Sequence, residues 1–460
     1  MADRRRRDLL ALTLVAVALR LPAILSPRHL SFDDGVYGAT AVAMRHGARP
    51  YRDVFSSQGP LHHPLIYLAD LVGLRTSVAP RTLSLAAGIA ITLCTYLAAR
   101  AVADRRAGLV AALLATTAGS LLLVTTGISG DGPAIAFAIG AVTVALSARD
   151  HDGWVRPVVA GLLVGAACSV KLLVGPVVLV VGLLLWNRRR PRQLVAAAVL
   201  AVAVPLALAA PWGYARVWDQ SVSYHREARR YTVGEVAWRI VTTLLERDLF
   251  VTVTALVVVG AALLARAAWR PSDLPVHERP GTIFGIWLGA QVGFLLAESA
   301  MWRPHVSQLV VPLCLLAALR LPSWRVLAVA WVVALPVWAI NVAGMVRPGG
   351  YRGADATVAA RLRALPDTAV VVTDDPGFPW RAGLRVPDAL VDVSVKQFDQ
   401  RRITEADVLR AARDRAVCAV LVTSGERMGR FPDLPARLTD DGYRTVLHDG
   451  ARRLLVRDCR

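Results

Sequence analysis

The feature that most constrains this chain is a series of apolar runs, each long enough to cross a lipid bilayer. A run of about eighteen or more residues with few charges is typical of a membrane helix. Hydrophobic residues make up 55% of the 460 residues, more than a soluble domain can cover with polar surface. The sequence therefore predicts a polytopic α-helical membrane protein with about eleven transmembrane helices. These lie at roughly 8–26, 80–100, 107–127, 133–148, 157–170, 172–186, 193–211, 249–268, 281–299, 306–320 and 326–345.

The charges between the runs predict the orientation of the chain. Arg4 to Arg7 should stay in the cytoplasm, which places the N-terminus inside and the C-terminal part outside the cell membrane. The stretch 157–186 has cytoplasmic-looking charge on both sides, so it must cross an even number of times. We expect two short helices that meet near Lys171, because one long helix would invert everything downstream.

The net charge of +19 needs no nucleic-acid partner to explain it. Nearly all of it is arginine, since Lys171 and Lys396 are the only lysines, and no nucleic-acid-binding motif accompanies it. Basic loops beside membrane helices explain the charge better. We expect no nucleic acid among the partners.

Two loops on the expected outer side break the charge rule, one at about 27–79 and the other at about 212–248. Both carry arginines between aromatic residues. An anionic headgroup at the outer surface would explain them, because guanidinium groups bind phosphate in a bidentate manner. The alternative is a solvated loop in an arginine-rich proteome. The candidate phosphate ligands here are Arg45, Arg49, Arg226 and Arg230.

The composition changes after Arg347, which divides the chain into a membrane domain, 1–347, and a C-terminal domain, 348–460. Short runs rich in β-branched residues alternate there with helical patterns. The sequence predicts a small α/β domain outside the membrane. An Asp449-Gly450 turn should join its last two strands. Cys418 and Cys459 could pair in an oxidising compartment.

Two adjacent carboxylates, Asp33 and Asp34, follow the first apolar run directly. A partly desolvated carboxylate at the bilayer boundary is a competent general base, and nearby arginines can hold a phosphate. Either residue could also lie in an exposed loop or cap a helix. Asp34 is well placed for such a cap, so we favour Asp33 as the base.

This arrangement resembles the GT-C superfamily of membrane glycosyltransferases, which includes protein O-mannosyltransferases and aminoarabinose transferases. Their first outer loop typically reads Asp-Glu, two residues, Tyr, and later a turn with Gly-Pro-Leu or Pro-Pro-Leu. This chain has Asp33-Asp34-x-x-Tyr37 and a Gly-Pro-Leu turn at 59–61. It departs from the pattern at Asp34, which replaces Glu, and at His62-His63, which replace aromatic residues.

Later segments are similar to further motifs of the superfamily. Asp131 enters the fourth helix, Lys171 follows a Gly-rich segment, and Arg303 and His305 precede a Pro-x-Leu helix. Each also has a plain alternative: Asp131 as a turn residue, Lys171 reaching the membrane surface, and the late loop merely solvated. His62 and His63 could bind a divalent metal with the carboxylates, although headgroup contact or packing explains them as well. No cofactor is assigned.

The resemblance implies an enzyme that takes a sugar from a polyprenyl-phosphate donor on the outer face of the membrane. The acceptor would be a glycan, lipid or protein of the cell envelope, and the reaction would invert the anomeric centre. One alternative is a transporter or flippase of lipid-linked intermediates, although no internal repeat supports it. Another is a non-catalytic scaffold that retains a lipid-binding groove.

Overall fold

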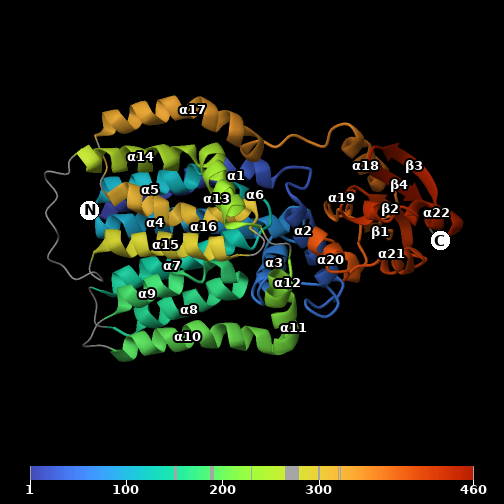
Figure 1. The fold of residues 1–460 in the computed structure, drawn as a ribbon, viewed down its shortest axis with the longest axis horizontal. Helices are drawn as coiled ribbons and strands as arrows, with labels where there is room; N and C mark the ends of the chain where they lie inside the picture. Colours follow the sequence, from blue (N-terminus) through green and yellow to red (C-terminus); the bar gives the residue numbers. More distant parts are fainter. Residues whose placement is uncertain are drawn as a thin grey trace.

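The computed structural model describes residues 2–149, 153–186, 191–228, 231–264, 279–298, 301–319, 321 and 323–458. Long helices lie side by side in a bundle, and an α/β part packs against one end of it (Figure 1). The bundle helices are α1 (Ala2–Ile24), α4 (Thr82–Val102), α5 (Arg105–Thr117), α6 (Gly119–Thr126), α7 (Asp131–Ala148), α8 (Val155–Val170), α9 (Val177–Leu185), α10 (Pro191–Ala209), α14 (Leu249–Leu264), α15 (Pro280–Ala297), α16 (Ser307–Leu319) and α17 (Trp324–Val346).

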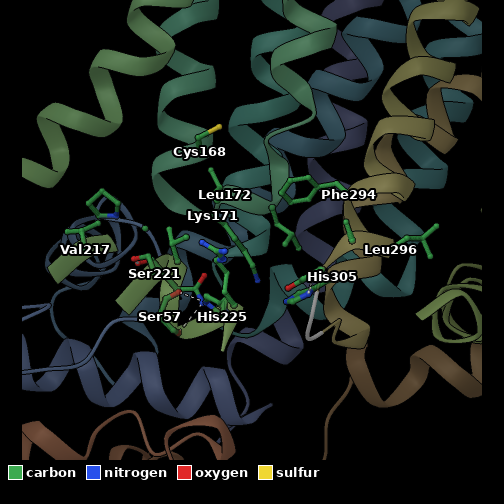
Figure 2. A pocket seen from close by; sticks show the side chains of 18 of the residues that line it. Ser57, Cys168, Lys171, Leu172, Val217, Ser221, His225, Phe294, Leu296 and His305 are labelled. Carbon is green, nitrogen blue, oxygen red and sulfur yellow. Dashed lines mark hydrogen bonds and ion pairs between the residues drawn. The ribbon is translucent and has the colours of Figure 1, made fainter. Parts of the chain in front are cut away.

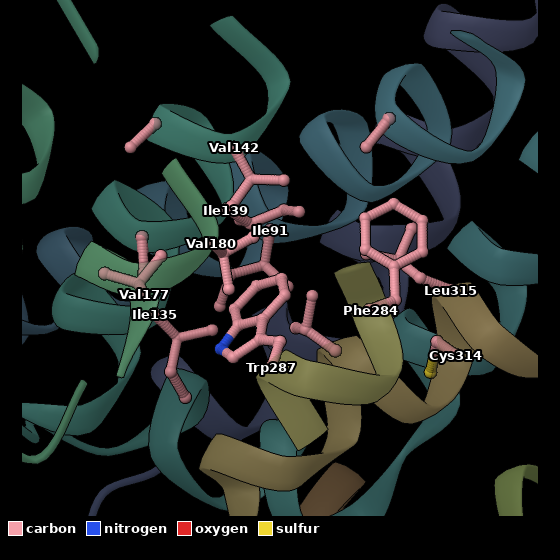
Figure 3. Close-up of a cluster of buried hydrophobic side chains, with 14 of the residues drawn as sticks. Ile91, Ile135, Ile139, Val142, Val177, Val180, Phe284, Trp287, Cys314 and Leu315 are labelled. Carbon is pink, nitrogen blue, oxygen red and sulfur yellow. The ribbon is translucent and has the colours of Figure 1, made fainter. Parts of the chain in front are cut away.

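Small residues let the bundle helices approach closely. Gly161 and Gly165 of α8 face α10, and a Cβ at Gly161 would lie 2.4 Å from the backbone oxygen of Ala197. Larger side chains fill the remaining space, among them Trp287 of α15 and Ile139 of α7 (Figure 3). In a bilayer such packing, rather than removal of apolar surface from water, holds helices together.

Five of the described helices are long and apolar enough to cross a membrane, or six if the bent pair α5–α6 forms one span. The protein is therefore a multi-pass membrane protein. Several of the other expected crossings fall on shorter apolar helices of the described part of the chain. These include α8, α14 and α16. A run of apolar residues indicates a membrane segment, but its composition does not show how long a helix it forms.

The expected break near Lys171 is confirmed. The backbone N–H of Lys171 caps α8, the chain turns at Leu172–Val174, and Pro176 precedes α9. Pro176 lacks a backbone N–H, so a helix tolerates it at its start and not in its interior. Two helices thus occupy the stretch 157–186.

Shorter helices gather at the end of the bundle that faces the α/β part (Figure 1). The chain between α1 and α4 forms α2 (Phe32–Arg45) and α3 (His62–Val72). The chain between α10 and α14 forms α11 (Tyr214–Trp218), a π-helical turn at Asp219–Ser223, α12 (Tyr224–Arg226) and α13 (Val233–Arg247). These two connections are the loops in which arginines were noted.

The C-terminal part contains a four-stranded mixed sheet of order β1-β2-β4-β3. Its strands are β1 (Val370–Thr373), β2 (Val417–Val422), β3 (Arg444–Asp449) and β4 (Arg452–Val456). β1 and β2 are parallel, whereas β4 pairs antiparallel with both β2 and β3. Its helices are α18 (Ala354–Arg363), α19 (Gly377–Ala382), α20 (Val395–Asp399), α21 (Glu405–Ala412) and α22 (Leu434–Asp440).

Local sequence signals in this part are confirmed. β3 and β4 form the expected hairpin, and Gly450 in its turn has a φ of 58°, which favours glycine. Thr404 starts α21 in a reciprocal cap with Asp407, the arrangement that a Thr followed three residues later by an acidic residue predicts. Cys418 is disulfide-bonded, whereas Cys459 lies outside the described residues.

The C-terminal part packs directly on α2. Gly377 of α19 abuts Gly35, and the Trp380 ring lies so close to Gly38 that a Cβ there would clash. The guanidinium groups of Arg81 and Arg381 lie 5.3 and 5.1 Å from the Trp380 ring. This contact fixes the sheet against the helix that carries the two adjacent carboxylates.

Candidate active site

Two adjoining cavities lie at the end of the bundle, and the second of them also reaches the α/β part. The first, of about 540 Å³, is mostly apolar; its wall includes Leu172, Phe294 and Leu296 (Figure 2). The second, of about 460 Å³, is called the polar cavity here because charged side chains from several elements line it, among them Asp33. Five residues line both cavities and so mark where they meet: Ser57, Gln58, Lys171, His225 and His305.

Asp33 lies in the first turn of α2, where Ser31 is the N-cap residue. Its side chain is exposed within the polar cavity, where the surrounding protein removes part of its hydration. This desolvation raises the pKa of Asp33 above its ordinary value, while the charge of Lys171 opposes the rise. A carboxylate of raised pKa in a cavity wall can accept a proton from a bound hydroxyl group.

Asp34 instead forms a fully buried ion pair with Arg81, with Oδ2 2.6 Å from Nη2. Its oxygens also accept the backbone N–H groups of Leu30 and Ile128, at 2.8 and 2.9 Å. Asp34 is not the helix cap considered from the sequence, since Ser31 fills that position. These contacts occupy its carboxylate, so the geometry favours Asp33 as the base.

Lys171 and Asp131 meet at the junction of the cavities. Lys171 Nζ lies 2.7 Å from Asp131 Oδ2, and Gln308 donates its amide N–H to Asp131 Oδ1 at 2.9 Å. His305 is also at the junction, where Nδ1 lies 3.0 Å from Glu298 Oε2. The structure thus brings together three residues that the sequence singled out separately.

Of the other expected cations, one lines a cavity and three form ion pairs away from the cavities. Arg226 lines the apolar cavity. Arg45 forms a bidentate ion pair with Asp70, Arg49 pairs with Asp53 at 3.0 Å, and Arg303 pairs with Glu246 at 2.9 Å. None of these three lines either cavity. Arg230 lies outside the described residues.

Tyr37 lines the polar cavity, and His62 and His63 pack behind it. The His62 ring meets the Tyr37 ring edge to face at 4.6 Å. Both histidines are buried, and within the described residues their ring nitrogens have no hydrogen-bond partner. Burial lowers the pKa of His63 to about 4, so both rings are neutral packing groups here. In the described part of the chain no three His, Cys, Asp or Glu side chains gather as a metal site.

Two residues of the site escaped the sequence reasoning. Lys396, in α20 of the C-terminal part, lines the polar cavity, and its Nζ lies 3.1 Å from His225 Nδ1. His225 Nε2 lies 2.8 Å from the backbone oxygen of Ser57, so Nε2 carries the ring proton. The sequence offered one signal, since Lys171 and Lys396 are the only lysines of this arginine-rich chain, and the structure places both in the wall of the polar cavity.

The bundle, the two helical connections at its end and the α/β part together define a fold of the GT-C membrane glycosyltransferase class. Residues 57–214 match the family model described as dolichyl-phosphate-mannose-protein mannosyltransferase. This match includes Asp131 and Lys171 but ends before the C-terminal part. None of the curated protein sequences compared with the chain matches it.

Solved structures agree with this fold over nearly the whole chain. ArnT from Cupriavidus metallidurans with bound undecaprenyl phosphate has a TM-score of 0.65 and 16% identity, covering 97% of each chain. Its apo state gives 0.67 at 16% identity, covering 99% of this chain and 98% of that one. The oligosaccharyltransferase AglB from Archaeoglobus fulgidus, with an inhibitory peptide and a dolichol-phosphate, gives 0.53 at 15% identity, covering 91% and 69%. The fold expected from the resemblance to the GT-C superfamily is thereby confirmed.

Proposed function

We propose that this protein transfers a sugar from a polyprenyl-phosphate donor to a hydroxyl group of a cell-envelope acceptor, with inversion at the anomeric carbon. The observation that carries the proposal is the position of Asp33. It lies in a polar cavity that meets a mostly apolar cavity at Lys171, His225 and His305. A polyprenyl-phosphate sugar has an apolar isoprenoid chain and a charged, polar head, so its binding requires an apolar cavity that joins a polar one.

The comparisons support the choice of donor. The matched family is described by a dolichyl-phosphate sugar, and the ArnT and AglB structures hold undecaprenyl phosphate and dolichol-phosphate. In this chain the isoprenoid would lie along the apolar cavity, with its phosphate near the junction. The sugar and the acceptor would share the polar cavity with Asp33.

The reaction needs a base and a stabilised leaving group. The acceptor oxygen attacks the anomeric carbon while its proton passes to an Asp33 carboxylate oxygen. The bond from the anomeric carbon to the phosphate oxygen breaks, and its electron pair stays on the phosphate. Cations near the junction offset this growing charge. Among the described residues, the basic side chains expected to bind phosphate that line a cavity are Lys171, Arg226 and His305.

We extend the proposal to topology. The membrane domain would comprise residues 1–347 and cross the bilayer about eleven times, with some spans formed by short or broken helices. The C-terminal domain, 348–460, would lie outside the cytoplasm together with both helical connections. The basic residues Arg4 to Arg7 at the other end of the chain support this orientation.

The test is direct transfer. Purified protein in lipid nanodiscs would be incubated with radiolabelled polyprenyl-phosphate sugars and envelope acceptors, and label would be followed into the acceptor. Transfer that depends on the polyprenyl phosphate supports the proposal. Movement of unmodified lipid-linked sugar across a bilayer, without transfer, would favour a flippase instead.

A further inference from the structure

The polar cavity has one wall from outside the bundle. Asp392, Ser394, Lys396 and Arg427, all from the C-terminal part, line it together with Asp33. Lys396 is the most informative of them, because burial lowers its pKa to about 8 and a buried ammonium group is costly unless something compensates its charge.

The charge of the Lys396 ammonium group is not balanced by an adjacent carboxylate, unlike that of the neighbouring Lys171. Lys171 has Asp131 as its ion-pair partner, and Nδ1 of His305 lies 3.0 Å from Glu298 Oε2. Within the described residues no carboxylate lies within 4.0 Å of Lys396 Nζ. Its one hydrogen-bond partner there is Nδ1 of His225, and its Nζ lies 5.7 Å from the centre of the Tyr224 ring. Two of its three N–H groups therefore remain available to a ligand.

Contacts across the interface hold α20 in place. The Ser394 hydroxyl lies 2.6 Å from the Tyr224 hydroxyl, and the Gln400 amide donates to the backbone oxygen of Tyr224 at 2.8 Å. Beside them Arg402 forms an ion pair with Asp219 at 2.8 Å. The position of Lys396 is thus set by the docking of the C-terminal part on α12 and the preceding turn.

We propose that Lys396 binds the phosphate of the lipid donor, so that the C-terminal part completes the active site of the enzyme. The inference rests on the proposed function. Lys396 and Asp33 line one cavity, so the base and the phosphate ligand can act on the same substrate. As the bond to the anomeric carbon breaks, two N–H groups of Lys396 donate to the phosphate oxygens that gain charge. His225 is a positioning residue: its Nδ1 accepts the third N–H.

The experiment measures binding of two probes to the full chain in nanodiscs. Undecaprenyl phosphate carries the anion, and the neutral polyprenol of the same length does not. Lys396→Gln should weaken undecaprenyl phosphate binding by about ten- to a hundredfold, as expected for a lost charge-assisted contact. It should leave polyprenol binding unchanged. Lys396→Arg should restore most of the phosphate binding, because it keeps the charge.

Arg402→Gln is the matched control. Arg402 crosses the same interface but lines neither cavity, and its partner Asp219 is solvent-exposed. This variant should change phosphate binding by less than about threefold. An equal loss in Arg402→Gln would overturn the inference, because the effect would then come from loosened docking.

The remaining outcomes separate the inference from the proposed function. Unchanged undecaprenyl phosphate binding in Lys396→Gln overturns the inference alone. A wild-type protein that binds undecaprenyl phosphate no better than polyprenol overturns the proposed function as well. Lys396→Gln could also weaken binding of both undecaprenyl phosphate and polyprenol. In that case the Lys396→Arg variant is the test. If it does not restore binding of undecaprenyl phosphate, Lys396 is not a phosphate ligand.

Discussion

Lys171 Nζ lies 2.7 Å from Asp131 Oδ2 at the junction of the two cavities, and both side chains are nearly inaccessible to solvent. Each charge is therefore compensated mainly by the other. The sequence placed Lys171 and Asp131 among the candidate donor ligands independently, since 40 positions separate them. Their pairing suggests a second role, in holding α7 against the end of α8.

We expect Lys171→Gln to destabilise the protein. Removing one member of a buried ion pair leaves the other charge uncompensated, which typically costs about 3–5 kcal/mol. The double variant Asp131→Asn with Lys171→Gln should recover much of this loss. Thermal unfolding of the detergent-solubilised protein measures the effect. If Lys171→Gln unfolds like the wild type, Lys171 acts mainly as a ligand.

Asp34→Asn should also destabilise the protein, for a related reason. It leaves the fully buried Arg81 guanidinium without its carboxylate, at a cost of about 3–5 kcal/mol. The expected result is low expression and a reduced unfolding temperature. Asp33→Asn is the control and should unfold like the wild type. An Asp34→Asn protein of normal stability that fails in catalysis would instead move the base by one residue.

Asp33→Asn should abolish transfer while leaving donor binding intact. Loss of a general base typically lowers the rate by about a hundred- to ten-thousandfold. The measurement is single-turnover transfer of labelled sugar at a saturating donor concentration, with undecaprenyl phosphate binding measured on the same sample. Wild-type turnover in Asp33→Asn would exclude the assigned role.

The rate of sugar transfer should fall on both sides of a pH optimum, giving an acid limb and an alkaline limb. Asp33 must be ionised to act as base, so activity should fall as the pH drops toward its raised pKa. Lys396 must be protonated to bind phosphate, so binding should weaken as the pH rises through about 8. Lys396→Arg should move the alkaline limb upward and leave the acid limb in place. The groups whose charges act on Lys396 are Glu298, Lys171, Asp33, Asp392 and His225.

An alkaline limb that stays fixed in Lys396→Arg would assign that limb to another group. The profile should be recorded for binding of undecaprenyl phosphate as well as for transfer. Binding should show the alkaline limb alone, because Asp33 acts in the chemical step. A limb common to both measurements therefore reports a group that acts in donor binding, and its upward shift in Lys396→Arg assigns it to Lys396.

Local sequence signals predicted the local structure well. The Thr404 cap, the turn at Asp449-Gly450 and the break at Lys171 each depend on a few neighbouring residues, and each is present. Asp33 could be favoured over Asp34 from the sequence, but the physical reason is Arg81, 47 positions away. Arg45 shows the opposite case: its charge suggested phosphate binding, whereas Asp70 is its partner.

The contact between Lys396 and His225 could not be predicted in this way. The two residues are 171 positions apart, and they meet only because the C-terminal part docks on α2 and α12. Nothing in the local pattern of α20 indicates a site. The number of membrane crossings stays a prediction, because apolar composition does not show which runs form a full span.

The orientation of the chain gives the last prediction. Single cysteines at Ala436 in α22 and at Ser77, between α3 and α4, should react with an impermeant thiol reagent in intact cells. Both positions are exposed, so failure to react reports the side of the membrane and not burial. Arg325→Cys, near the start of α17, is the matched control and should react only after the cells are opened, because the arginines of the connection at 320–325 favour the cytoplasmic side. The unsubstituted protein corrects for the native cysteines, among them Cys168 in the wall of the apolar cavity.

Labelling of position 77 together with protection of position 436 would mean that the chain crosses the membrane an odd number of times between them. The C-terminal part would then lie in the cytoplasm, away from position 77, and the docking of α19 on α2 could not occur in that orientation.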